Sequence, residues 1–121
     1  MSDGFGPLLQ ALVERVPGAL GAIFTDWEGE PVGSFGTALA DSDLEIIGAQ
    51  WTLVWTQLQR SLERVRLGAP HELVIDSARA RVIIRQVSAE YCLVLAAQRG
   101  THLAIAQREL ERTAVSLRAQ M

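Results

Sequence analysis

The 121-residue sequence contains no lysine, a single cysteine and no apolar run of the length that crosses a membrane. A P-loop needs a lysine that reaches the phosphates of a nucleotide, so the absence of lysine excludes this motif. A membrane-spanning helix needs about 18 or more consecutive apolar residues, and no stretch of the chain reaches that length. The chain is therefore predicted to be neither a P-loop GTPase nor a transmembrane protein.

The single cysteine, Cys92, rules out an intramolecular disulfide and favours a reducing, cytoplasmic location. The opening residues 1–4 lack the basic region and long apolar run of a signal peptide, which favours the same compartment. Cys92 itself lies within an apolar stretch, and no nearby group is expected to lower its pKa. We interpret it as a buried neutral thiol rather than as a nucleophile.

The charge of the chain argues against nucleic-acid binding. The net charge is −3, and no basic stretch is long enough to follow a phosphate backbone. All 11 basic residues are arginines. Arginine suits protein interfaces, because its planar guanidinium pairs with carboxylates and stacks on aromatic rings. The composition thus favours a protein partner over a nucleic acid.

Hydrophobic periodicity and turn residues predict eight elements within one domain spanning residues 1–121. Ser42 and Glu45 match a capping box, which predicts where the longest helix begins. The expected elements are a helix over 5–16, strands over 19–26 and 31–35, a helix from 42 to about 66, strands over 71–76, 81–87 and 90–98, and a helix from 101 to about 119.

Two of the predicted strands, 19–26 and 90–98, are apolar on both faces and should therefore lie side by side in the middle of the sheet. Short connectors between the last three strands require antiparallel hairpins. The predicted fold class is α/β (α+β), with a five-stranded antiparallel sheet in the order 2-1-5-4-3. The long helix should cover one face of the sheet, and the two terminal helices the other.

This pattern resembles the roadblock/dynein light chain family. The resemblance lies in the apolar helix 8–12, in the strand segment 18–26 and in the Asp-x-x-Gly turn that ends at Gly29, and it extends over about residues 5–119. It implies homo- or heterodimers that join through the third strand and the long helix. Bacterial members are often partners of Ras-like small GTPases, and the gliding-motility regulators among them stimulate GTP hydrolysis.

One broad apolar arc on the long helix is expected to cover the sheet, because successive helical residues are about 100° apart. Trp51 and Trp55 in this arc are also candidates for packing against the same helix of a second subunit, since tryptophan often anchors interfaces. The arc comprises Leu44, Ile47, Trp51, Val54, Trp55, Leu58, Leu62 and Val65.

The opposite side of the long helix presents two apolar residues, Ile46 and Leu53, bordered by polar ones. Such a patch is typical of a docking site, although isolated surface hydrophobic residues are also common. The predicted partner-binding residues are Ile46, Gln50, Leu53, Gln57, Arg60 and Arg64.

The strand over 71–76 is a predicted sheet edge, and its unpaired backbone groups must be covered or paired. Leu73, Val74 and Ile75 carry no charge that would deter pairing with a second copy, so they join Trp51 and Trp55 as predicted dimer-interface residues. The alternative is a monomer whose edge is protected by the flanking residues 72 and 76. The sequence leaves a homodimer and a heterodimer with a paralogue equally open.

No catalytic, cofactor-binding or metal-ligating constellation is predicted. His71 and His102 begin separate elements, without metal-ligand spacing to each other or to Cys92, and are interpreted as capping or surface residues. The acidic pairs 41/43 and 28/30 fall at a helix start and at a turn, where capping and solvation explain them. The chain is therefore expected to act by binding rather than by catalysis.

The favoured function is a homodimeric regulator of a Ras-like small GTPase. Direct insertion of Arg60 or Arg64 into the GTPase is a weaker hypothesis, because an arginine on a helix has limited reach. One alternative is a structural adaptor dimer that does not affect nucleotide turnover. Another is a small-molecule sensor, which is disfavoured because no polar group is expected within the apolar core.

Overall fold

Three helices and five strands follow one another in the predicted order along residues 4–121, the part of the chain that the computed structural model describes. Residues 1–3, on which the signal-peptide interpretation rests, lie outside the described residues. The elements are α1 (Gly6–Arg15), β1 (Ala19–Asp26), β2 (Pro31–Gly36), α2 (Asp41–Arg64), β3 (Glu72–Asp76), β4 (Ala80–Gln86), β5 (Tyr91–Gln98) and α3 (Leu103–Ala119).

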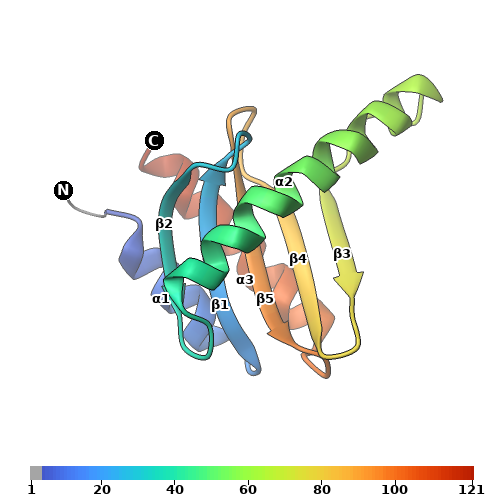
Figure 1. The fold of residues 1–121 in the computed structure, drawn as a ribbon. Helices are drawn as coiled ribbons and strands as arrows, with labels where there is room; N and C mark the ends of the chain where they lie inside the picture. Colours follow the sequence, from blue (N-terminus) through green and yellow to red (C-terminus); the bar gives the residue numbers. More distant parts are fainter. Residues whose placement is uncertain (1–3) are drawn as a thin grey trace.

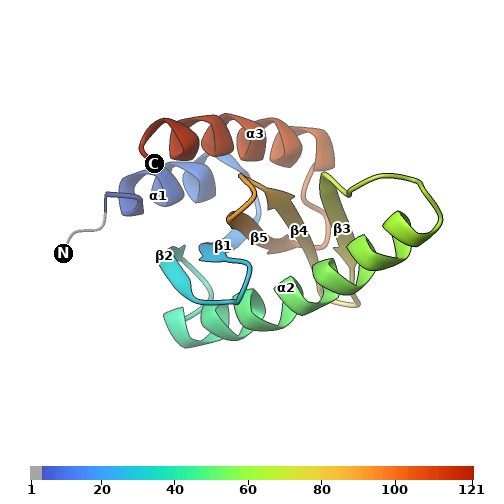
Figure 2. The same ribbon diagram turned by 90° about the horizontal axis from the view of Figure 1, so that it is seen from above.

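The five strands form one antiparallel sheet in the order β2-β1-β5-β4-β3, which confirms the predicted topology (Figure 1). The doubly apolar strands β1 and β5 are neighbours at the centre, with Phe24 opposite Leu93. Seen from above, α1 and α3 lie on one side of the sheet and α2 on the other (Figure 2). The predicted layers are therefore confirmed, with β2 and β3 as the two edges.

The larger part of the core fills the space between the sheet and the pair α1/α3. Leu9, Leu12, Leu95 and Leu110 are fully buried there. Phe24 from β1 packs edge-on against Phe5, with ring centroids 5.1 Å apart. Burying side chains of this size contributes about 1.5–3 kcal/mol each, so this layer holds the two terminal helices on the sheet.

The second part of the core lies between the sheet and the N-terminal half of α2. Leu44 and Trp55 are each 1% exposed and pack on Ile23. Gly48 lets the helix approach β1 closely, because an added Cβ would stand 2.8 Å from Cγ2 of Thr25. Small residues at the contact thus fix where α2 crosses the sheet.

Two expectations for the long helix were wrong. The helix begins at Asp41 after the N-cap residue Ala40, and no side chain caps it, so Ser42 and Glu45 form no capping box. The apolar arc also does not lie on the sheet along its whole length, because Val54 is 42% and Val65 is 64% exposed. The buried face is instead centred on Gly48 and Thr52, two small residues that hydrophobicity alone does not single out.

The helix α2 crosses its face of the sheet obliquely, and its C-terminal part extends past the edge strand β3 (Figures 1 and 2). This overhang explains why the second half of the arc is exposed. No helix within residues 4–121 is both long and apolar enough to cross a membrane.

Candidate protein interaction surfaces

The outer face of α2 is the first candidate surface. Ile46 and Leu53, at 61% and 62% exposure, point away from the sheet as the sequence indicates. Arg60 follows Leu53 by seven residues and continues the same row, and it is exposed. We call Ile46, Leu53 and Arg60 the outer row. The other predicted partner-binding residues, Gln50, Gln57 and Arg64, are also exposed and lie beside this row.

The second candidate surface lies between the flank of α2 and the face of β3. Ile47 and Trp51 on α2, and Leu73 and Ile75 on β3, pack on the second part of the core but stay half-buried. Val54, one turn beyond Trp51, is more exposed still. An apolar surface left open between a helix and a sheet edge is typical of a contact with another chain.

Two residues of the predicted dimer interface have other surroundings. Trp55 is 1% exposed within a single chain, where its ring lies 5.1 Å from that of Trp27, so it has almost no surface left for a second subunit. Val74 faces the opposite side of the sheet and packs on the core under α3. Trp27, which the sequence analysis assigned no role, also donates a hydrogen bond from its indole nitrogen to the carbonyl oxygen of Ser88.

The edge strand β3 pairs with β4 on one side only. Both carboxylates that flank its apolar centre are bound within the chain. Asp76 accepts a hydrogen bond from Arg81 at 2.7 Å, which lowers the pKa of the Asp76 carboxyl below 3.8. Glu72 accepts one from Arg85, also at 2.7 Å. These carboxylates therefore do not stand as free charges that would repel a second strand.

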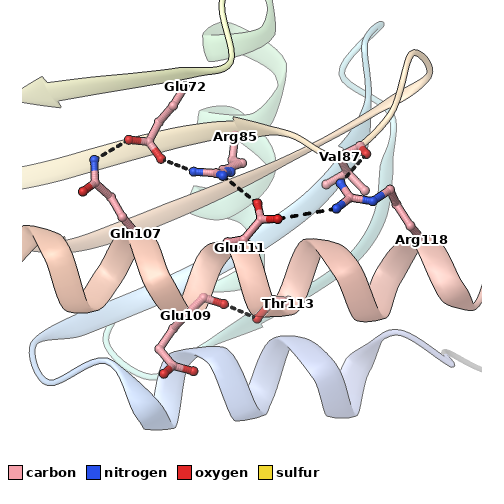
Figure 3. Close-up of polar contacts among 8 residues, drawn as sticks. All are labelled: Glu72, Arg85, Val87, Gln107, Glu109, Glu111, Thr113 and Arg118. Carbon is pink, nitrogen blue, oxygen red and sulfur yellow. Dashed lines mark hydrogen bonds and ion pairs between the residues drawn. The ribbon is translucent and has the colours of Figure 1, made fainter.

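A polar network on the α3 side of the sheet holds β3 in place (Figure 3). Arg85 bridges Glu72 on β3 and Glu111 on α3. Arg118 extends the network by binding Glu111 and by donating to the carbonyl oxygen of Val87. The members are far apart in the sequence, so spacing along the chain gave no sign of this network.

One polar side chain enters the core, contrary to the expectation that none would. Glu109 on α3 is 5% exposed and points away from the network toward α1 (Figure 3). Its carboxylate oxygens lie 3.5 Å from Arg108 and 3.8 Å from Arg112. Its nearest charged neighbours are thus exposed arginines of its own helix, which compensate the buried charge.

The cysteine and the two histidines have structural surroundings. Cys92 is fully buried beside the Thr25 hydroxyl, and burial raises the pKa of its thiol to about 11. His102 caps α3, because its Nδ1 accepts a hydrogen bond from the backbone N–H of Ile105. His71 is exposed before β3. Among residues 4–121, no group of three or more His, Cys, Asp or Glu side chains is placed to hold a metal ion.

Comparison with known proteins turns on the fold rather than on the sequence. No family model and no curated protein sequence matches the chain. The roadblock/LC7 domain from Streptomyces avermitilis superposes with a TM-score of 0.87 over 93% of each chain, at 19% identity. The chain has the roadblock/LC7 fold. The family resemblance predicted from the sequence is thereby confirmed at the level of the fold.

Two further structures extend the roadblock/LC7 likeness. MglB in a tetrameric arrangement has a TM-score of 0.85 at 15% identity, covering 97% of this chain and 90% of its own. MglC from Myxococcus xanthus has a TM-score of 0.66 at 27% identity, covering 95% of this chain and 97% of its own. Similarity at these identities gives the roadblock architecture, whereas the residues on α2 and β3 are particular to this chain.

Proposed function

We propose that this chain is a non-catalytic homodimer that binds a Ras-like small GTPase in the cytoplasm and modulates its GTPase cycle. The proposal assigns the two candidate surfaces to two partners. The open surface between α2 and β3 receives a second copy of the chain, and the outer row of α2 receives the GTPase. The observation that carries it is the pair Ile46 and Leu53, each more than 60% exposed on one helix.

Self-association is supported by the state of the edge strand. β3 has free backbone groups on one side, an apolar centre, and flanking carboxylates that Arg81 and Arg85 already bind. Joining two such edges continues the sheet across both subunits and satisfies these backbone groups. The same contact covers Trp51, Leu73 and Ile75, which are half-buried in a single chain.

A protein partner for the outer face is supported by its composition. Two apolar side chains bordered by glutamine and arginine resemble the centre and rim of a transient interface. The family resemblance implies that this partner is a Ras-like small GTPase, and MglB and MglC are among the structures with this fold. In an antiparallel dimer the two copies of α2 would lie on the same face of the joined sheet and offer the GTPase one continuous platform.

Regulation without catalysis is the form of action that fits the arginines. Arg60 and Arg64 are exposed on a regular helix and form no ion pair among the described residues. A guanidinium held on a helix reaches a neighbouring surface but not a deep active site. We therefore propose that they bind the outside of the GTPase and shift the positions of its own switch loops.

The test is to mix the purified chain with Ras-like GTPases of its source organism, each loaded with GDP or with a slowly hydrolysed GTP analogue. We expect a complex with one of them, preferring one nucleotide state, and a changed rate of GTP hydrolysis or nucleotide exchange. A complex that leaves both rates unchanged would support the adaptor role instead. The absence of any complex would refute the GTPase assignment.

A further inference from the structure

The flank of α2 carries a seven-residue repeat. Ile47, Val54 and Ser61 form one set of positions, and Trp51, Leu58 and Val65 form the other, with alternating spacings of three and four residues. This is the spacing by which two helices pack side by side as a coiled coil. Val54, Ser61 and Val65 are exposed and the other three are half-buried, so the repeat is open along its length.

A second repeat of seven residues borders this apolar flank on the outer side. It consists of Asp43, Gln50, Gln57 and Arg64, all exposed. Neither Asp43 nor Arg64 has an ion-pair or hydrogen-bond partner among residues 4–121, whereas the charged groups of β3, β4 and α3 are extensively paired. We call these four residues the polar row.

Resting on the proposed homodimer, we infer that the polar row is a self-complementary code that pairs α2 with a second copy of itself in one antiparallel register. Read in the two directions, the row places Asp43 beside the partner subunit's Arg64 and Gln50 beside the partner subunit's Gln57. A parallel arrangement would instead place like charges together, which is unfavourable.

The apolar repeat agrees with the same register. It sets Trp51 against the partner subunit's Val54 and Leu58 against the partner subunit's Ile47, so each contact joins two apolar side chains. A shift by one heptad would place Trp51 against the partner subunit's Ser61 and Gln57 against its own copy. Charge and packing thus select one arrangement, and they favour a second copy of this chain over a paralogue that lacks the row.

The helix dipole offers another reason for an acid near the start of α2 and a base near its end. Charge reversal separates the two explanations. Asp43→Arg or Arg64→Asp alone should weaken self-association about tenfold, because two symmetric pairs, each worth roughly 0.2–1 kcal/mol, become repulsive. The double variant should recover the wild-type affinity if the row pairs. If only the dipole matters, the double variant should be the weakest.

The experiment is sedimentation equilibrium of the full chain at low and high salt. An equimolar mixture of Asp43→Arg and Arg64→Asp proteins should form heterodimers more strongly than either associates alone. Glu45→Arg is the matched control: it reverses an exposed acid two residues away on the other side of the helix and should leave self-association unchanged. Circular dichroism checks that each variant is folded.

A crosslink reads the register directly. Gln50→Cys mixed with Gln57→Cys should form a disulfide between the two proteins on mild oxidation, whereas Gln57→Cys alone should not, and the buried Cys92 does not compete. A wild-type chain that stays monomeric refutes the proposed homodimer. A wild-type dimer that neither reversal weakens, or that crosslinks through Gln57→Cys alone, refutes this inference and leaves the proposed homodimer standing.

Discussion

Two leucines on opposite sides of α2 give the sharpest prediction about function. Leu44 is 1% exposed and packs on the sheet, whereas Leu53 is 62% exposed on the outer row. Truncating a buried leucine to alanine removes its transfer free energy and leaves a cavity, so Leu44→Ala should lower the free energy of unfolding by about 2–5 kcal/mol. Leu53→Ala should change it by less than about 0.5 kcal/mol.

The order reverses for binding of the GTPase. Full burial of a leucine is worth about 1.5–3 kcal/mol, and roughly three-fifths of Leu53 is still available to a partner. Leu53→Ala should therefore weaken the complex by about 1 kcal/mol, or roughly fivefold. Ile46→Ala lies two turns away and should add a similar loss, giving about thirtyfold in the double variant.

Urea denaturation and isothermal titration calorimetry against the GTPase measure the two quantities. Leu53→Ala must leave the mass of the dimer unchanged, because the outer row points away from the flank that meets the second copy. If the Leu53→Ala and Ile46→Ala double variant binds as tightly as the wild type, the outer row is not the docking surface.

Three further predictions concern the fold. Gly48→Leu should lower the free energy of unfolding by about 1–3 kcal/mol in urea denaturation, because its Cβ would stand 2.8 Å from a methyl of Thr25. Cys92, with a pKa near 11 and no exposure, should react with a thiol reagent at pH 8 only after unfolding, and rapid labelling of the native chain would contradict its burial. Because the folded pKa of Asp76 lies below 3.8, its pairing with Arg81 stabilises the chain above about that pH and is lost as the pH falls through the folded value; the stability difference between wild type and Arg81→Gln should therefore shrink in acid denaturation below pH 3.8 and should not grow.

The sequence predicted the sheet because local signals agreed with one another. β1 and β5 read as apolar on both faces and lie at the centre, while Pro31 and the mixed pattern of β3 marked the edges. The exposure of Ile46 and Leu53 also followed from helical periodicity alone, since seven residues return nearly to the same side of a helix.

What the sequence did not predict depends on contacts between distant segments. The buried face of α2 is centred on Gly48 and Thr52, whose small size matters only because β1 lies against them. The ion pairs of Arg85 join three elements separated by many residues. Trp55 was assigned to the dimer interface because its large apolar side chain has the same character in a core as on a surface.

The apolar flank of α2 was assigned to the sheet because periodicity finds an apolar stripe without saying what it packs against. In the structure only the first half of that stripe meets the sheet, and the second half extends past β3 (Figure 1). The direction in which a helix crosses a sheet depends on the whole contact, so the overhang became visible only with the fold.

The most direct test of the account is the molar mass of the wild-type chain in solution. Size-exclusion chromatography with multi-angle light scattering at micromolar concentration should give twice the 13.2 kDa of one chain, or an even multiple of it. A mass of 13.2 kDa would mean that the edge of β3 and the flank of α2 stay uncovered, and it would contradict the account at its foundation.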